Sequence, residues 1–217
     1  MKNKGKFITL EGIEGVGKTS NLEYIQALLE AAGQTCVVTR EPGGTPLGES
    51  LRSLLLTHSD QQMSDNAELL LMFAAREEHL EKVILPALAH GHTVLCDRFT
   101  EATYAYQGGG RGIDSDKIAE LETWVQGDLR PDLTIILDAP VEVGRLRASK
   151  RSSPDRIEKE KNDFFNRVRE YYLEMSAHYP HRICTIDASV ELDDVKKQVK
   201  AQLYEYNILH EDIDLTN

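Results

Sequence analysis

The sequence has 217 residues, of which 41% are hydrophobic and 28% are charged, as is ordinary for a globular protein. Its formal net charge of −11 argues against a general nucleic-acid-binding protein, which would normally carry an excess of basic residues. No apolar run approaches the roughly 20 residues that a membrane-spanning helix needs, and the start of the chain does not fit a signal peptide. We therefore expect one cytoplasmic domain over residues 1–217, with neither a membrane nor a nucleic acid as its partner.

Strands and helices alternate along the chain. Short, nearly continuous apolar segments predict five strands, at 6–10, 35–39, 93–96, 133–137 and 183–186. Helices are expected at 20–32, 47–56, 67–89, 101–106, 114–126, from 140 onward, at 156–178 and at 190–206, with Asp65 or Asn66 as the cap of the helix at 67–89. This alternation favours an α/β fold with a five-stranded parallel sheet and helices on both faces.

Three cysteines, Cys36, Cys96 and Cys184, lie in apolar, strand-like segments. Their number is odd and their spacing does not suit a metal site. We expect buried free thiols of a protein from a reducing compartment.

A glycine-rich motif follows the first strand and precedes the first helix. Its glycines let backbone N–H groups turn toward phosphate oxygens at the start of a helix. The lysine of such a motif reaches the terminal phosphates, and the threonine hydroxyl that follows it holds Mg²⁺. The sequence therefore predicts an ATP site with the residues Gly12, Ile13, Glu14, Gly15, Val16, Gly17, Lys18 and Thr19.

Three classes of phosphate-loop protein compete for this chain. A GTPase switch would carry an Asn-Lys-x-Asp motif and an Asp-x-x-Gly motif, and neither is present in the sequence. A motor or transporter ATPase would need further domains or a signature motif that the sequence lacks. A small-molecule kinase predicts arginines at strand ends and a basic lid that closes over the reactants to exclude water.

A basic cluster after the fourth strand suits such a lid. Arginines match the charge that spreads over a phosphoryl group during transfer. The expected lid covers approximately residues 145–156 and contains Arg145, Arg147, Lys150, Arg151 and Arg156.

Several longer motifs carry a family resemblance. The chain resembles bacterial thymidylate kinases over residues 5 to about 206, in the segments Glu11–Thr19, Thr39–Thr45, Phe73–Arg76, Asp97–Phe99, Ala105–Gly112 and Asp155–Glu158. The resemblance implies a P-loop nucleoside-monophosphate-kinase-like three-layer fold. It also implies transfer of the γ-phosphoryl group of ATP to dTMP with Mg²⁺, as a step in dTTP biosynthesis, by a homodimer.

The resemblance assigns roles to single residues. Lys18 and Arg98 act in catalysis, and Asp97 joins Thr19 at the metal. The lid supplies a further catalytic arginine in the subtype that has Gly15 at this position, and Arg151 is expected in that role, with Arg147 as the alternative. The dTMP site takes Glu14, Glu41, Arg52, Phe73, Arg76, Arg98, Thr103, Tyr106 and Gln107.

Within this site, the resemblance places an aromatic ring on thymine and Arg76 at its O4 oxygen. Relatives commonly have the aromatic residue four positions before the arginine, where this chain has Met72, so either Phe73 or Met72 lies on the base. Tyr106 is expected under the deoxyribose. The segment after the fifth strand, Asp187–Ser189, is the expected adenine pocket.

No general base is needed for such a transfer, because a phosphate monoester with a second pKa of about 6 is mostly a dianion at neutral pH. Two alternatives stay open at this point. The chain could be a kinase of another pyrimidine nucleoside monophosphate (dUMP, UMP or CMP), or a non-enzymatic nucleotide-binding switch. The residues 207–217 form an acidic tail to which the sequence assigns no role.

Overall fold

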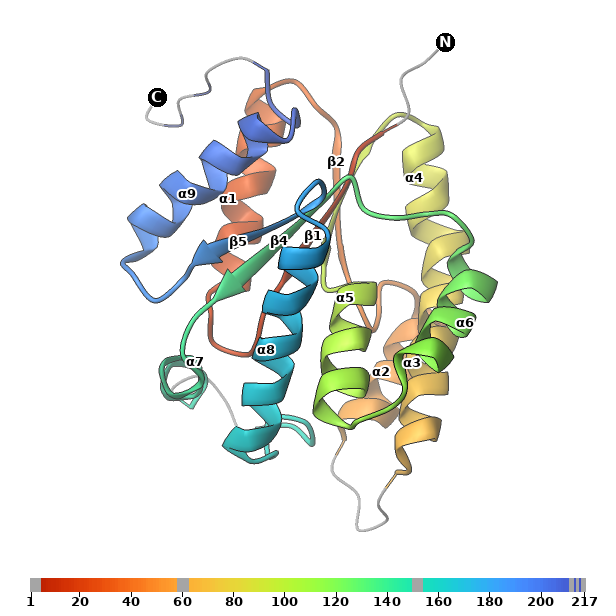
Figure 1. Ribbon diagram of the computed structural model, residues 1–217. Coiled ribbons are helices and arrows are strands. Elements are labelled where there is room, and N and C mark those ends of the chain that lie inside the picture. The colour runs from red at the N-terminus through yellow and green to blue at the C-terminus, as the bar shows by residue number, and fades with distance from the viewer. Residues whose placement is uncertain (1–4, 58–62, 150–153, 211–212, 214, 216–217) are drawn as a thin grey trace.

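A computed structural model describes residues 5–57, 63–149, 154–210, 213 and 215 and contains one five-stranded sheet (Figure 1). All four strand pairings are parallel, and the strand order across the sheet is β2-β3-β1-β4-β5. The strands are β1 (Phe7–Glu11), β2 (Cys36–Arg40), β3 (Thr93–Asp97), β4 (Leu133–Asp138) and β5 (Ile183–Asp187). The predicted α/β fold with a parallel sheet is confirmed.

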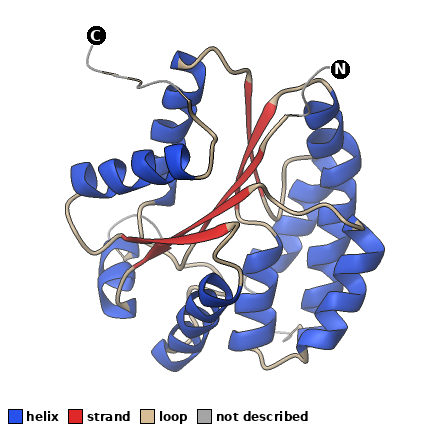
Figure 2. Cartoon of the chain, turned by 45° about the horizontal axis from the view of Figure 1, so that its top comes forward, coloured by secondary structure: helices blue, strands red, loops and turns tan. Residues whose placement is uncertain are grey.

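Helices cover both faces of this sheet, as Figure 2 shows with the strands in red between two groups of helices. On one face α1 packs against α9, and on the other α8 packs against β4 and β5. The α-helices are α1 (Lys18–Ala31), α2 (Pro46–Leu56), α3 (Asp65–His79), α4 (Leu85–Ala89), α5 (Thr100–Thr103), α6 (Ser115–Gln126), α7 (Val141–Ala148), α8 (Asn162–His178) and α9 (Leu192–Glu205), and two π-helical segments are η1 (Leu80–Ile84) and η2 (Tyr104–Gly110).

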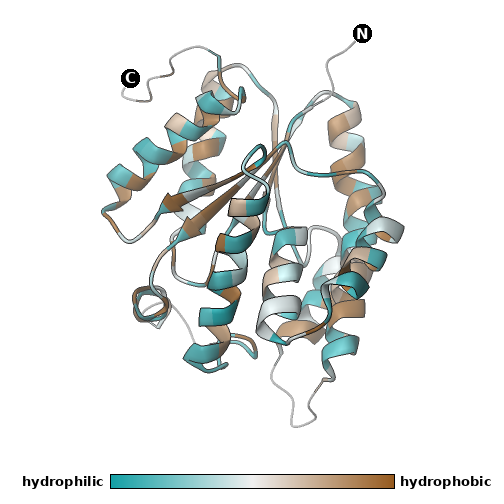
Figure 3. Ribbon diagram, viewed as in Figure 1, coloured by the Kyte–Doolittle hydropathy of each residue, from teal (hydrophilic) through white to brown (hydrophobic). Residues whose placement is uncertain are grey.

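The core lies on the two faces of the central strands, which are brown in the hydropathy view of Figure 3. Ile8, Leu10 and Ile135 are fully buried there. β2 is an edge strand and is only partly covered. Because both faces of β1 and β4 are covered, these strands can be apolar almost throughout, which is the pattern that the sequence displays.

The prediction of one long helix at 67–89 was wrong in two details. Its cap is Ser64, whose hydroxyl accepts a hydrogen bond from the amide of Ala67 at 3.4 Å, and not Asp65 or Asn66. The helix is also interrupted by η1 just before Pro86. Proline lacks an amide hydrogen and crowds the preceding turn, so a wider turn in front of it relieves the mismatch.

The helix predicted at 101–106 continues as η2 to Gly110, so the prediction ended it four residues too early. Gly109 and Gly110 allow α8 to come close, because a Cβ on Gly110 would lie 2.4 Å from the Phe164 ring. The glycines therefore serve packing in this segment.

The helix predicted at 156–178 begins only at Asn162. The residues before it form turns in which the Asp155 carboxylate accepts the amides of Ile157 and Glu158, each at 2.8 Å. An aspartate that bonds its own backbone two or three residues on favours a turn over a helix.

Two further sequence features have a structural counterpart. The cysteines are free, with Cys96 and Cys184 buried and Cys36 partly buried. The start of the acidic tail is part of the core, since Ile208 and Leu209 are each only 2% exposed. Within the described ranges, the search for a helix long and apolar enough to cross a membrane finds none.

Candidate active site

The glycine-rich loop joins the end of β1 to the start of α1 at the carboxyl edge of the sheet (Figure 1). Gly12, Gly15 and Gly17 have φ values of 129°, 77° and 96°, a region that favours glycine. Gly15 also lies against α7, because a Cβ there would be 1.9 Å from the carbonyl oxygen of Gly144. A larger residue at this position would therefore need α7 to move.

Lys18 begins α1 and folds over the loop. Its Nζ donates hydrogen bonds to the carbonyl oxygens of Gly12 at 3.1 Å and Ile13 at 3.0 Å. Burial lowers the pKa of Lys18 to about 8. The Lys18 amine is thus held beside the loop, where a bound phosphate would lie. It loses its proton at a lower pH than an exposed lysine does.

Thr19 and Asp97 suit a hydrated divalent cation that arrives with a nucleotide. The two residues line the same hollow beside β2, and the Thr19 side chain is exposed. Asp97 Oδ1 is buried and has no hydrogen-bond partner among the described residues. Within those residues there is also no cluster of three or more His, Cys, Asp or Glu that could hold a metal by itself.

Arg98, the first residue after β3, has φ 69°, which is rare for a residue with a side chain. Its guanidinium is paired with Glu14 of the phosphate loop, with Nη2 2.7 Å from Glu14 Oε1. The Tyr106 hydroxyl accepts from Arg98 Nη2 at 3.0 Å and donates to the Glu14 carboxylate at 3.0 Å. An unusual backbone conformation that turns a side chain into a cleft is typical of functional positions.

Glu11 and Tyr172 form a chain of hydrogen bonds that ends at Arg98. Glu11 is fully buried, and its carboxylate accepts from the amide of Phe99 and from the Tyr172 hydroxyl, each at 2.7 Å. The same Tyr172 oxygen accepts from Arg98 Nη1 at 3.2 Å. Burial raises the pKa of Glu11 to about 8, so the surroundings of Arg98 hold less negative charge than the count of carboxylates suggests.

A pocket opens beside this cluster and contains most of the residues predicted for dTMP. It is lined by Glu14, Glu41, Pro42, Arg52, Leu56, Met72, Arg76, Arg98, Phe99, Ala102, Thr103, Tyr106, Gln107, Asp155 and Ile157. Of the predicted set, Phe73 is the residue that does not line it. The structure thus brings residues from six separate segments of the chain to one cavity.

Arg76 forms the inner wall of this pocket and is 2% exposed. Its Nε donates to Glu41 at 2.8 Å and its Nη2 to the Thr103 hydroxyl at 2.9 Å. Nη1 is buried and has no partner among the described residues, so the pocket offers one unused donor. His79, also buried, holds the other Glu41 oxygen at 3.0 Å and so fixes the carboxylate.

Phe73 lies behind Arg76, with its ring centre 4.9 Å from the guanidinium carbon, and packs in a cluster with Leu69 and Ile118. The stack of the Phe73 ring on the base is therefore not supported by this arrangement. Met72 lines the pocket instead. A one-residue shift around a helix turns a side chain by about 100°, which sequence spacing alone could not resolve here.

Two predicted dTMP residues are held by neighbours. Arg52 Nη1 donates to the Pro42 carbonyl at 2.9 Å, and burial lowers the pKa of Arg52. Gln107 donates from its side-chain nitrogen to Glu68 at 2.7 Å.

The lid arginines differ in what they contact. Arg145 Nη1 donates to the Glu160 carbonyl at 2.6 Å. Arg147 Nη1 donates to the Ala188 carbonyl at 2.8 Å and so faces the segment after β5 that was predicted to bind adenine. The expected catalytic residue Arg151 lies outside the described residues.

The comparisons with known proteins agree with this geometry. A sequence model of the family described as thymidylate kinase matches residues 10–199. The chain belongs to the thymidylate kinase family. It is 54% identical over 200 residues to a thymidylate kinase of Nitrosospira multiformis, covering 92% of this chain and 97% of the relative. It is 56% identical over 195 residues to one of Alcanivorax borkumensis, covering 90% and 94%.

A solved structure shows the same fold. The crystal structure of thymidylate kinase from Ehrlichia chaffeensis superposes with a TM-score of 0.76 at 36% sequence identity, covering 92% of this chain and 99% of that chain. The P-loop nucleoside-monophosphate-kinase-like fold that the thymidylate kinase resemblance implied is thereby confirmed.

Sequence reasoning missed several residues that shape this site. His79, Glu68 and Tyr172 were not singled out, because a histidine, a glutamate or a tyrosine on a helix gives no motif. No pattern in the sequence distinguishes these three residues from the other polar and aromatic residues of their helices.

The lowered pKa of Lys18 predicts the pH dependence of nucleotide capture. In the free protein Lys18 loses its charge as the pH rises through about 8, so kcat/KM for ATP should fall above that pH. Bound phosphates favour the charged amine, so kcat should stay level to a higher pH. Steady-state rates between about pH 6 and 10 measure both.

Lys18→Arg is the control for this prediction, because a guanidinium stays charged over the whole range. Its activity should be lower, but its kcat/KM for ATP should no longer decline near pH 8. A wild-type profile that stays flat up to about pH 10 would contradict the role given to Lys18.

Proposed function

We propose that this chain transfers the γ-phosphoryl group of ATP to dTMP, giving ADP and dTDP, as a step in dTTP biosynthesis. The observation that carries the proposal is the position of Glu14 and Arg98. Both line the pocket that offers an unused donor at Arg76, and Glu14 belongs at the same time to the phosphate loop. A monophosphate in this pocket would thus lie next to a nucleotide held by that loop.

The reaction requires positioning and charge stabilisation more than proton transfer. An oxygen of the dTMP phosphate, which is mostly a dianion at neutral pH with a pKa of about 6, attacks the γ-phosphorus while the bond to the β-phosphate oxygen breaks. Arg98 and Arg52 would hold the acceptor phosphate, and Lys18 the terminal phosphates of ATP. When bound, Mg²⁺ with Thr19 and Asp97 would neutralise charge on the phosphate oxygens of ATP.

The pocket suits thymine for a chemical reason. Thymine presents an acceptor at O4 beside a donor at N3. The free Nη1 of Arg76 can donate to O4, and Thr103 and Gln107 lie along the same wall. Met72 would contact the face of the base. Tyr106 would lie under the deoxyribose, where its bond to Glu14 fixes the hydroxyl.

Two other expectations belong to this proposal. A single kinase domain over the chain and a cytoplasmic location remain predictions from the sequence. The competing substrates dUMP, UMP and CMP share the pyrimidine ring, and a nucleotide-binding switch would use the same phosphate loop without turnover.

One assay separates these possibilities. ADP release from ATP and Mg²⁺ is measured with dTMP, dUMP, UMP and CMP in parallel, with a no-acceptor sample as the control. We expect the highest kcat/KM with dTMP, and for CMP a value lower by at least about a hundredfold, because its base edge reverses the donor and acceptor of thymine. Equal rates with CMP and dTMP would contradict the assignment of dTMP as the substrate. Tight ATP binding without turnover would support a nucleotide-binding switch.

The lid arginine is tested by substitution. We propose Arg151 as the catalytic lid arginine, with Arg147 as the alternative, as the family resemblance implied. Arg151→Ala should lower kcat by at least about a hundredfold, the effect of losing an electrostatic stabiliser of the transition state. Arg147→Ala is the matched control and should mainly raise KM for ATP, and a reversed pattern would assign the role to Arg147.

We also propose a homodimer, as the family resemblance implied. Exposed apolar side chains lie on α3 and α6, which pack against each other: Leu70 is 56% and Trp124 82% exposed. Burying such side chains in an interface is favourable by about 25 cal/mol per Å² of apolar surface.

Sedimentation velocity tests this arrangement with the double variant Leu70→Arg/Trp124→Arg. We expect a dimer for the unchanged chain and a monomer for the variant. Leu146→Arg is the control, because Leu146 is similarly exposed, at 62%, but lies on α7. A wild-type monomer, or a double variant that stays dimeric, would contradict the proposal.

A further inference from the structure

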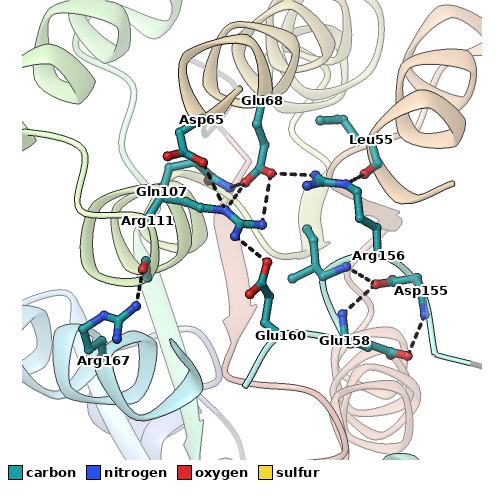
Figure 4. A network of polar contacts seen from close by, with 12 residues as sticks. Leu55, Asp65, Glu68, Gln107, Arg111, Asp155, Arg156, Glu158, Glu160 and Arg167 are labelled. Carbon is teal, nitrogen blue, oxygen red and sulfur yellow. Dashed lines mark hydrogen bonds and ion pairs between the residues drawn. The ribbon is translucent and has the colours of Figure 1, made fainter. Parts of the chain in front are cut away.

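Glu68 is a buried carboxylate, 1% exposed, at the centre of a polar network between α3, η2 and the segment 155–160 (Figure 4). Its Oε1 accepts from Gln107 Nε2 at 2.7 Å and from Arg111 Nε at 3.3 Å. Its Oε2 accepts from Arg156 Nη2 at 2.6 Å and from Arg111 Nη2 at 3.3 Å. One side chain therefore joins three segments that are far apart in the sequence.

The segment 155–160 has further attachments beside the pocket, since Ile157 packs in the core and is 7% exposed, and Arg145 Nη1 donates to the Glu160 carbonyl at 2.6 Å. Arg156 donates from Nε to the Leu55 carbonyl at 2.8 Å, and its amide donates to the Leu56 carbonyl at 3.1 Å. At the other end, Glu160 is paired with Arg111, which Glu68 also binds. Because Asp155 and Ile157 line the pocket, the position of this segment sets the shape of the cavity.

Glu68 also determines which end of the Gln107 amide faces the pocket. An ionised carboxylate only accepts hydrogen bonds, so the amide nitrogen of Gln107 must turn toward Glu68. The amide oxygen, on the opposite side of the same carbon, is then left for the pocket, which Gln107 lines. An acceptor in that place suits the N3–H of thymine, whereas cytosine has an acceptor at its own N3.

We propose that Glu68 is a positioning residue that holds the segment 155–157 against the pocket and fixes the Gln107 amide, and that it thereby sets the preference for a base with a donor at N3. The proposal rests on the proposed function for its substrate. Glu68 does not line the cavity and acts through Arg156 and Gln107.

The charges of the network agree with this role. The bonds from Gln107, Arg111 and Arg156 outweigh burial and lower the pKa of Glu68, so the group is ionised at neutral pH. The removal of one charge from a buried cluster leaves the opposite charges without compensation. Arg111 and Arg156 would then share a neutral partner, and the segment 155–160 would be held less firmly.

The test uses Glu68→Gln in the full-length protein, with Asp65→Asn as the matched control. Asp65 lies one turn earlier on α3 and is 3.7 Å from Arg111, but it is not bonded to Gln107 or Arg156. A glutamine at position 68 can donate as well as accept, so the Gln107 amide can turn around and offer its nitrogen to the base.

Steady-state kinetics with dTMP and dCMP measure the first consequence. We expect Glu68→Gln to raise KM for dTMP and to lower the dTMP:dCMP ratio of kcat/KM by at least about tenfold, which corresponds to about 1.4 kcal/mol. Asp65→Asn should keep the ratio. A ratio that changes by less than about twofold in a folded Glu68→Gln protein would overturn the role in base choice.

Amide hydrogen exchange without substrate measures the second consequence and does not depend on the reaction. Peptides covering 154–160 should exchange faster in Glu68→Gln than in wild type or Asp65→Asn. Unchanged exchange would contradict the proposal that Glu68 holds this segment in place. If wild type does not phosphorylate dTMP, the proposed function fails, while the exchange result still decides whether Glu68 holds the segment.

A thermal unfolding curve shows whether Glu68→Gln is folded. If it is not, Arg156→Lys replaces it, because lysine keeps the charge but cannot reach both Glu68 and the Leu55 carbonyl with one planar group. This variant should speed exchange of 154–160 and raise KM for dTMP, while the dTMP:dCMP ratio stays near that of wild type. Unchanged exchange and KM would overturn the proposal.

Discussion

The ion pair between Arg98 and Glu14 is the interaction on which the candidate site depends. It joins the end of β3 to the loop after β1 at 2.7 Å and requires Arg98 to adopt a backbone conformation that side chains disfavour. The amide of Arg98 nevertheless still bonds to Leu10 of the neighbouring strand, at 3.0 Å. The sheet therefore holds the arginine in place, and the cost of that conformation is offset by the strand pairing and the buried partners around it.

This pair also explains why an acid can stand inside a phosphate-binding loop. Glu14 neutralises Arg98 before any substrate binds, and the raised pKa of Glu11 leaves the cluster with little excess negative charge. In the proposed reaction, an incoming phosphate dianion would compete with Glu14 for the guanidinium. Glu14 would then be free for another donor, such as a sugar hydroxyl or a hydrated cation.

The parts of the fold and site that follow from local rules were predictable from the sequence. The loop at 12–19, the parallel sheet and the placement of Asp97 and Arg98 at a strand end depend on spacing and on strand polarity. Which of Met72 and Phe73 lines the pocket was not predictable, because it depends on which face of α3 packs against α6. The π-helical turns at η1 and η2 were missed for a similar reason, since a single extra residue in a helical turn is set by packing against neighbours.

Glu68 marks the limit of sequence reasoning more sharply. Nothing in its neighbourhood along the chain distinguishes it from a glutamate on a solvated helix face, and its partners follow it by 39, 43 and 88 residues. A buried carboxylate is tolerated only when donors from elsewhere satisfy it. Three separate segments must therefore meet before its burial is favourable, so the burial of Glu68 depends on the segment 155–160 and η2 together.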